Sequence, residues 1–141
     1  MDGNGGGLIA ASSNQATSNG GSVGAPWGCT TVQIPGASGQ AIGTGMQNTI
    51  DIEAGCTTPG IAADICANLT LNGYSDWFLP SRYEMQEMYL NKNIIGSFGN
   101  NFYWTSTESG NSYAYLVQFS NGYEWQLNKN NSESVRAIRA F

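Results

Sequence analysis

The sequence predicts an α+β domain in which two or three short helices pack on an antiparallel sheet joined by long Gly-rich loops. Three observations support this fold class. Helical spacing of apolar residues occurs between Met46 and Leu90, period-two alternation begins after Gly99, and 19 of the 141 residues are glycine. This length suits one hydrophobic core, so we expect a single domain over residues 1–141. We also expect it to be cut from a longer polypeptide, because Met1 runs straight into a Gly-rich turn.

Two helices are predicted in the first half of the chain. The first ends near Cys56, and its apolar residues recur at intervals of four on one helical face: Met46, Ile50 and Ala54. The second ends near Gly73, and its apolar residues show the same spacing: Ile61, Ile65 and Leu69. Pro59 separates the two helices, since proline blocks simple continuation of the first.

A third helix carries the clearest local signal. Ser81 can cap it, and Glu84 follows at the spacing of a capping box, so we expect a helix from Arg82 to about Leu90. Three of its residues fall on one face that we expect to pack in the core: Met85, Met88 and Tyr89.

Strands are predicted at both ends of the chain and in a hairpin. "LIAAS", from Leu8 to Ser12, suits a short buried strand, and "SVRAIRAF" ends the chain as another. Between them "YAYLVQFSNGYEWQLNK" places an Asn-Gly turn between two alternating segments. We therefore expect Tyr113 to Ser120 to pair with Tyr123 to Lys129.

Two turns are possible for this hairpin. A two-residue type I′ turn at Asn121-Gly122 places Gln118 opposite Trp125 and Ser120 opposite Tyr123, and these aromatic residues then face solvent if Val117 and Phe119 are core. A three-residue turn with Gly122 as a bulge would instead bury the aromatics. We favour the first.

The charge balance excludes one class of partner. Charged residues make up 11% of the chain and its formal net charge is −5, whereas phosphate-backbone binding needs clustered Lys and Arg. We therefore expect no nucleic acid partner. No apolar run approaches 18 residues, so we expect no membrane insertion, and "MDGNGGG" lacks the features of a signal peptide.

Three cysteines leave the disulfide state open. Cys29, Cys56 and Cys66 suit either three partly buried thiols or a Cys29–Cys56 bridge with one thiol left over. The chain contains no His, so a Cys/His zinc site is excluded.

No catalytic motif is recognisable. Without His, a Ser-His or Cys-His nucleophile is unavailable, and the carboxylates are scattered with no spacing typical of a glycosidase pair. "DGNGGG" at Asp2 to Gly7 lacks the ligand series of a calcium loop and opens no dinucleotide-binding helix. We expect no enzyme, no metal and no cofactor.

Two arginines near the chain end require partners. Arg136 and Arg139 are flanked by apolar residues, and a half-buried guanidinium needs a carboxylate or carbonyl acceptor. We predict that at least one of them pairs with a buried acceptor such as Asp76.

Four motifs occur together in a characteristic order: "NGYSDWFLPSRYEMQEMY", "FYWTSTES", "FSNGY" and "VRAIRAF". They resemble the Lcl-type C-terminal domain of bacterial collagen-like adhesins and of many surface and phage proteins, which is related to the sulfatase-modifying-factor branch of the C-type lectin fold. The resemblance runs from "GGLIAAS" to Phe141. It is closest to the variable proteins of diversity-generating retroelements, whose C-terminal segment is mutated at adenines ahead of a fixed tail. The seven Asn from Asn100 to Asn131 fit adenine mutagenesis.

The resemblance implies a rigid scaffold that displays a variable surface in residues 100–134. It implies a receptor-recognition or adhesion domain at a cell surface or on a virion, with a protein or glycan ligand and with Trp125 and Tyr113 as anchors. The residues that it implies as variable or ligand-binding are Ser109, Asn111, Ser112, Tyr113, Gln118, Glu124, Trp125, Gln126, Asn128, Asn130, Asn131 and Ser132.

Two alternative functions accompany this interpretation. One is a glycan-binding surface adhesin domain, although the Glu-Pro-Asn and Trp-Asn-Asp motifs of calcium-dependent lectins are absent. The other is an enzyme remnant of the formylglycine-generating oxidase branch, although the late cysteines of those oxidases are absent after Cys66.

Overall fold

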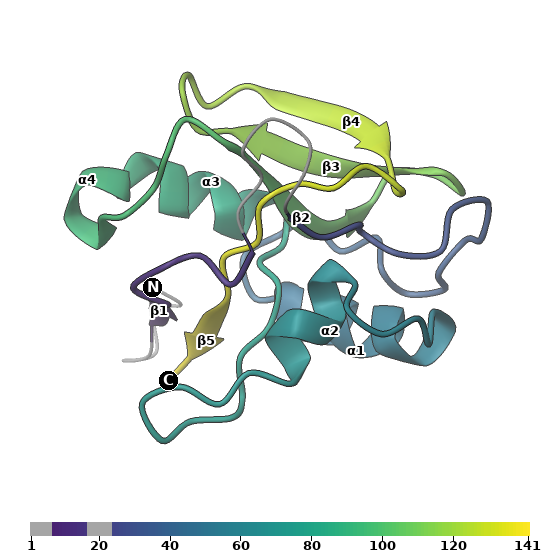
Figure 1. The fold of residues 1–141 in the computed structure, drawn as a ribbon, viewed down its shortest axis with the longest axis horizontal. Helices are drawn as coiled ribbons and strands as arrows, with labels where there is room; N and C mark the ends of the chain where they lie inside the picture. Colours follow the sequence, from purple (N-terminus) through teal and green to yellow (C-terminus); the bar gives the residue numbers. More distant parts are fainter. Residues whose placement is uncertain (1–6, 17–23) are drawn as a thin grey trace.

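A three-stranded antiparallel sheet forms one side of the molecule (Figure 1). Its strands are β2 (Phe102–Glu108), β3 (Tyr113–Gln118) and β4 (Glu124–Asn128), with β3 in the centre and β4 at an edge. The computed structural model describes residues 7–16 and 24–141. β3 is therefore supported by a neighbour on each side, whereas β4 has β3 alone as a hydrogen-bonded strand within this sheet.

The two ends of the described chain meet in a second, smaller sheet. β1 (Leu8–Ala10) pairs antiparallel with β5 (Ile138–Ala140), and Gly7 and Phe141 exchange two backbone hydrogen bonds of 3.0 Å. The predicted first and last strands are thus confirmed, though both are shorter than predicted. β4 lies on the opposite side of the molecule from this small sheet (Figure 1).

The described residues include four short helices, so the α+β class is confirmed. They are α1 (Gly45–Gly55), α2 (Ala62–Ala67), α3 (Arg82–Leu90) and α4 (Lys92–Ile95). α1 and α2 lie on the side of the molecule away from β4, while α3 and α4 lie beside the sheet (Figure 1). The four-residue α4 has no counterpart in the sequence prediction.

Helix α3 begins with the predicted capping box. Glu84 N donates to Ser81 Oγ at 3.4 Å, and Ser81 N donates to Glu84 Oε1 at 2.8 Å. The other carboxylate oxygen of Glu84 accepts from Gly43 N at 2.8 Å, so this buried side chain also fixes the loop before α1. Met85 and Met88 are buried as predicted.

Helix α1 buries a different face from the apolar stripe seen in the sequence. Met46 is 40% exposed and Ile50 is 53% exposed. The buried face is mostly polar and consists of Gly45, Asn48, Thr49 and Ile52. The buried polar side chains are satisfied: Asn48 Nδ2 donates to a backbone carbonyl at 2.7 Å, and Thr49 Oγ1 accepts from a backbone N–H at 3.0 Å. Satisfied hydrogen bonds and close backbone approach therefore decide which face is buried.

The β3–β4 hairpin closes differently from the predicted two-residue turn. Leu116 lies opposite Trp125, and Gln118 N donates to Tyr123 O at 2.8 Å across the end of the ladder. The predicted pairs, Gln118 with Trp125 and Ser120 with Tyr123, are therefore wrong by two residues.

Phe119 accounts for this shift. Its N–H donates to Asn101 O at 2.9 Å rather than to β4, and its ring packs against Tyr103 and, edge to face, against Tyr89. The turn must then span residues 119–122, and Gly122 closes it with φ +78°.

A shift of two residues preserves which side chains share a face. Val117 and Phe119 are buried, whereas Tyr123 is 64% and Trp125 is 50% exposed. The predicted outward orientation of the two β4 aromatics is thus confirmed, and the bulged three-residue turn is excluded.

The sheet separates two clusters of buried side chains. Leu116 and Ala114 belong to the larger cluster, which also contains Trp27 and Trp104, while Val117 belongs to the smaller cluster beside α3. We call the two sides of β3 the Leu116 face and the Val117 face. Because β3 is buried on both faces, it is the rigid centre of the sheet.

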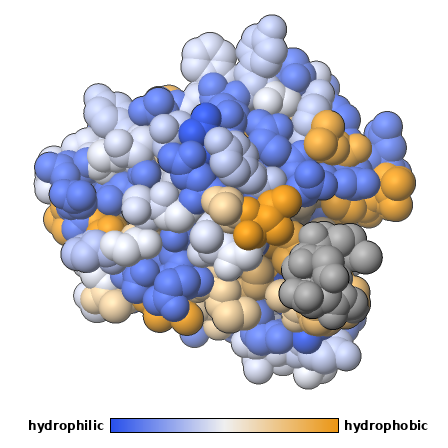
Figure 2. Space-filling view, turned by 180° about the vertical axis from the view of Figure 1, so that it is seen from behind, coloured by the Kyte–Doolittle hydropathy of each residue, from blue (hydrophilic) through white to orange (hydrophobic). Residues whose placement is uncertain are grey.

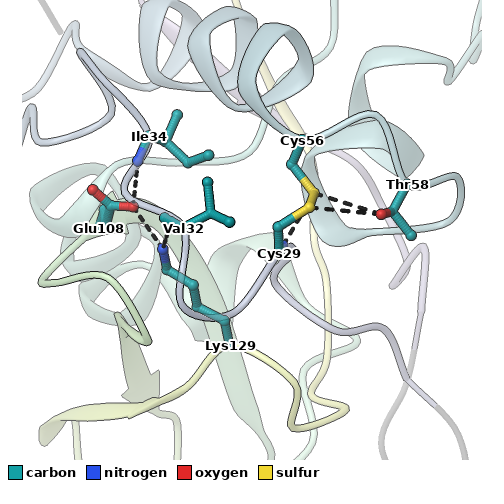
Figure 3. The surroundings of a disulfide bond; sticks show 7 residues. All are labelled: Cys29, Val32, Ile34, Cys56, Thr58, Glu108 and Lys129. Atoms are coloured by element: carbon teal, nitrogen blue, oxygen red, sulfur yellow. Dashed lines mark hydrogen bonds and ion pairs between the residues drawn. A yellow bond between two sulfur atoms is a disulfide. The ribbon is translucent and has the colours of Figure 1, made fainter.

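A disulfide and a buried ion pair hold the segment before α1 (Figure 3). Cys29 and Cys56 form a disulfide, which resolves the open alternative, and Cys66 is a buried free thiol. Lys129 Nζ lies 2.6 Å from Glu108 Oε2, and the same carboxylate oxygen accepts from Ile34 N at 2.8 Å. These contacts attach the loop to the ends of β2 and β4.

Both arginines near the chain end have partners, as predicted. Arg139 Nε lies 2.7 Å from Asp76 Oδ1, although the Asp76 side chain is 48% exposed rather than buried. Arg136 is fully buried and donates to the carbonyl oxygens of Ala11 at 2.9 Å and Ser97 at 2.6 Å. The guanidinium of Arg139 is therefore paired with a carboxylate, whereas that of Arg136 is bonded mainly to backbone carbonyls.

Candidate functional site

The twelve residues implied as a binding surface lie on the β3–β4 hairpin and on the loops at one of its ends. Six are exposed: Asn111, Tyr113, Trp125, Gln126, Asn130 and Asn131. The other six are partly buried: Ser109, Ser112, Gln118, Glu124, Asn128 and Ser132. The hairpin lies at the edge of the molecule that is remote from the paired chain ends (Figure 1). The small sheet of β1 and β5 therefore does not lie over these positions.

The two expected anchors stand on opposite faces of the sheet. Trp125 lies opposite Leu116 and therefore shares the Leu116 face. Tyr113 lies opposite Asn128 and is an even number of residues from Val117, so it shares the Val117 face. Each of the two rings is 50% exposed. The predicted set consequently divides into two surfaces that meet at the edge strand β4.

The indole of Trp125 is held in place. Its Nε1 donates to Gln118 Oε1 at 3.0 Å, and Gln118 Nε2 donates in turn to Ser120 Oγ at 2.9 Å. The ring is thus oriented by a polar chain along the hairpin while half of its surface stays in contact with solvent. Such a ring loses little conformational freedom when a partner covers it.

Glu124 is part of the scaffold as well as of the surface. Its two carboxylate oxygens accept from Arg82 Nε at 2.7 Å and from Arg82 Nη2 at 3.0 Å, a bidentate pair between β4 and α3. The guanidinium lies 4.3 Å from the ring centroid of Tyr115. This pair and stack fix the edge strand against helix α3.

An open hollow of about 490 Å³ lies around the same residues. It is lined by Arg82, Tyr115, Gly122, Tyr123, Glu124, Trp125 and Gln126. Its walls combine three aromatic side chains with the Arg82–Glu124 ion pair and the amide of Gln126. Tyr123 is absent from the residues implied by the resemblance, but at 64% exposure it is the most exposed ring on the hairpin. This hollow can accept a ligand by ring contact and by hydrogen bonding.

The loop end of the hairpin gathers the remaining predicted positions. Lys129 N donates to Ser112 O at 2.8 Å, which brings the turn before β3 beside the segment after β4. Asn128 Oδ1 accepts from Asn130 N at 3.1 Å and from Thr30 Oγ1 at 3.2 Å. Ser109 Oγ is buried and makes no hydrogen bond with the described residues. The loop end is thus a polar surface of amides around an ordered turn.

The buried pair Lys129–Glu108 was not recognisable in the sequence. Lys129 has no exposed side-chain surface, Glu108 has 5%, and Lys129 Nζ also donates to Val32 O at 2.8 Å (Figure 3). The alternation of β4 places Lys129 one residue beyond the strand, where a solvent-exposed lysine would be the default. Their partnership arises from three segments that are distant in sequence.

The back of the molecule carries both hydrophobic and hydrophilic side chains. Figure 2 shows the hydrophobic ones in several separated groups between hydrophilic residues. Three exposed aromatic side chains of the described residues belong to the β3–β4 hairpin: Tyr113, Tyr123 and Trp125. The hairpin is therefore the place where exposed aromatic area is concentrated along the described chain.

The three cysteines of the chain are in two different states. Cys29 and Cys56 are joined, and burial raises the pKa of the remaining thiol, that of Cys66. No three His, Cys, Asp or Glu side chains are grouped as metal ligands among residues 7–16 and 24–141. None of the helices in that part of the chain is long and apolar enough to cross a membrane.

One comparison with known proteins identifies the family. The sequence model of the Lcl C-terminal domain matches residues 26–139, which is most of the chain. The chain therefore belongs to the Lcl C-terminal domain family. No curated protein matches the chain.

Proposed function

We propose that this member of the Lcl C-terminal domain family is a non-catalytic ligand-binding domain, and that it displays diversified residues on a C-type lectin scaffold. In this proposal it is the variable protein of a diversity-generating retroelement and serves receptor recognition or adhesion. The recognition surface is formed by the β3–β4 hairpin and its loop end, with Trp125, Tyr113 and Tyr123 as the main contact rings.

The observation that carries the proposal is that buried and exposed side chains alternate within one hairpin. Ala114, Leu116 and Val117 of β3 are fully buried, and Lys129 just beyond β4 is buried as well. Six of the twelve implied positions, interspersed with these framework residues, are exposed. Exposed side chains can be exchanged at little cost in stability, whereas exchange of the buried ones creates cavities or unpaired charge.

The chemistry of the exposed residues suits recognition of varied partners. Tyr and Trp supply large contact area with only two side-chain torsions, and Asn, Ser and Gln supply adaptable hydrogen bonds. Ionic groups on the hairpin are few, and Glu124 is already paired with Arg82 at 2.7 Å. Binding at this surface therefore desolvates little unpaired charge.

Two features support a location at a cell surface or on a virion. The Cys29–Cys56 disulfide is of a kind that persists in oxidising surroundings. The hairpin also lies away from the paired ends of the described chain (Figure 1). A domain attached through either end would thus hold its recognition surface outward.

A glycan ligand is the second candidate, and one observation favours it. The indole of Trp125 is half-exposed and hydrogen-bonded to Gln118, and the exposed amide of Gln126 follows it on β4. Aromatic faces stack on sugar rings, while amides bond to sugar hydroxyls.

Sequencing the natural gene from many isolates of one population tests the proposal. We expect substitutions to concentrate at the twelve implied positions, and we expect buried residues of the same hairpin to stay fixed, namely Ala114, Leu116, Val117 and Lys129. An unmutated template copy of the segment should lie near the gene. Substitutions spread evenly over displayed and buried positions would refute diversification.

A further inference from the structure

A second cavity lies on the Leu116 face and shares Trp125 with the open hollow. It measures about 260 Å³ and is lined by Phe102, Leu116, Trp125, Leu127 and Glu133. This volume is below the range usual for drug-sized ligands, so the cavity suits one side chain of a larger ligand. Its apolar walls meet a single ionisable group, the carboxyl of Glu133.

Three of the walls of the cavity belong to the framework of the sheet. Leu116 is fully buried, and Phe102 and Leu127 pack against the larger core cluster. Trp125 forms the remaining wall, and its indole is oriented by the hydrogen bond to Gln118. The cavity is therefore formed before any ligand arrives, which lowers the entropic cost of binding.

Glu133 is held at the cavity by its backbone. It exchanges two hydrogen bonds of 3.0 Å with Ala25, and the next residue, Ser134, donates to Phe102 O at 3.0 Å. Its side chain is partly buried, and this burial raises the pKa of the carboxyl. Within residues 7–16 and 24–141 the structure gives this carboxyl no hydrogen bond and no ion pair.

Among the described residues, no Lys or Arg side chain is left over for this carboxylate. The Lys and Arg residues of the chain number five, and all are occupied. Arg82, Lys129 and Arg139 pair with acidic side chains within 2.7 Å. Arg136 donates to backbone carbonyls, and Lys92 Nζ donates to Phe119 O at 2.9 Å. A basic side chain of a partner would therefore complement Glu133 on a chain whose formal net charge is −5.

We propose that this cavity binds a lysine or arginine side chain of a protein ligand. The methylene groups of such a side chain would lie against Leu116 and Leu127, and the cation would face the rings of Trp125 and Phe102 and pair with Glu133. The inference rests on the proposed function and specifies its ligand as a protein that presents a basic residue.

Acidic ligands fit this cavity poorly. A sulfate, a carboxylate or a phosphate would meet an unpaired carboxylate, and the occupied cations offer it no free partner. A neutral sugar could stack on Trp125, but its binding would depend little on the charge of Glu133.

The test uses nitrogen-15-labelled protein at pH 8 and follows the Trp125 Nε1–H resonance. The probe is Nα-acetyl-lysine N-methylamide. Nα-acetyl-norleucine N-methylamide is its uncharged analogue, and methyl β-glucopyranoside represents a neutral sugar. Glu133→Gln is the test variant. Glu87→Gln, which alters an exposed acid on α3, is the control with the same change in net charge.

The lysine probe should shift the Trp125 resonance with a dissociation constant in the millimolar range, and norleucine should bind about tenfold more weakly. Glu133→Gln should weaken lysine binding about tenfold, whereas Glu87→Gln should leave it unchanged. Equal binding of lysine and norleucine, or indifference to Glu133→Gln, would overturn the inference.

Two further outcomes separate this inference from the proposed function. If the glucoside shifts Trp125 and lysine does not, the surface binds ligands and the basic-residue inference is wrong. If no probe shifts Trp125, the cavity inference is again wrong. The proposed recognition function is then still tested separately by the distribution of natural substitutions.

Discussion

Two tryptophans of the sheet show how the position of a residue decides its role. Trp104 is fully buried and its Nε1 donates to Ala25 O at 2.9 Å, whereas Trp125 is 50% exposed and bonded to the side chain of Gln118. The two residues are identical in chemistry and lie in one cross-strand row of the sheet, on either side of Leu116. One therefore stabilises the fold, and the other is available to a ligand.

Alanine substitution should separate these roles. Trp104→Ala should lower the free energy of unfolding by about 3–5 kcal/mol, because it leaves a large cavity. Trp125→Ala should lower it by about 1 kcal/mol or less, since half of its surface is already in water. Urea denaturation measures both. A loss above about 3 kcal/mol for Trp125→Ala would show that this ring belongs to the core.

The buried pair Lys129–Glu108 gives a second prediction. Lys129→Met should destabilise the protein by about 3–5 kcal/mol, because it leaves the carboxylate of Glu108 buried without its cation. The double variant Lys129→Met/Glu108→Gln should recover part of this loss, since neither side chain is then charged. Urea denaturation of the single and double variants completes the cycle. A single variant as stable as the parent would show that the pair is replaceable.

Local patterns predicted some residue contacts and missed others. The bonds between Ser81 and Glu84 follow from a three-residue spacing, which the sequence displays directly. Arg139 with Asp76 was inferred from the need of a guanidinium for an acceptor. Lys129 with Glu108 joins side chains that no local spacing connects, so nothing in the sequence pattern distinguished this lysine from an exposed one.

At the scale of elements, helix α3 was predicted closely and strand β2 was not assigned. α3 spans Arg82–Leu90 as expected, because its cap and its apolar face are both local signals. β2 is buried from Tyr103 to Glu108, so it lacks the alternation that marks a half-exposed strand. The apolar stripe of α1 also predicted the wrong buried face, because the side of that helix that is buried is mostly polar.

The hairpin turn depends on Gly122. Its φ is +78°, and a Cβ at this position would lie 2.5 Å from the Tyr89 ring. Gly122→Ala should therefore destabilise the protein by about 1–3 kcal/mol and disturb the loop that sets the register of β4.

Gly43→Ala is the control for this substitution. Gly43 also has a positive φ, but no atom lies within 4 Å of a Cβ built there. Thermal unfolding of both variants should show the larger loss for Gly122→Ala. Equal losses of stability in the two variants would mean that position 122 requires glycine for its backbone conformation alone and not for the contact to Tyr89.

At the scale of the whole molecule, stability should depend on pH through Glu53. Burial, a hydrogen bond to Asp64 on α2 and the charge of Asp64 together raise the pKa of Glu53 from 4.5 to about 7. Between these two values the folded protein holds a proton that the unfolded chain has lost, so the unfolding free energy should fall as pH rises from 4.5 to 7.

The expected loss over this range is about 1 kcal/mol, because Glu53 and Asp64 are only partly buried and solvent screens their interaction. Glu53→Gln should flatten this part of the stability profile, as measured by urea denaturation at several pH values. A stability that rises with pH over the same interval in the parent protein, and not in Glu53→Gln, would contradict the assignment.

The recognition surface as a whole was only partly predictable. The resemblance implied positions along the hairpin, and the structure shows half of them exposed, but it divides the two anchors between opposite faces. That division follows from the alternation of side chains along the strands, and the two-residue shift of the register leaves it unchanged. The cavity at Glu133 adds a residue that the variable segment contains but that the resemblance did not imply.

The most direct test of the central claim is the unfolding free energy of one multiple variant. All six exposed positions are changed to alanine: Asn111, Tyr113, Trp125, Gln126, Asn130 and Asn131. If a stable scaffold carries a separable recognition surface, urea denaturation should give a value within about 2 kcal/mol of the parent. A loss of about 4 kcal/mol or more, comparable to the loss expected for Trp104→Ala alone, would show that these residues hold the fold together and would contradict the account.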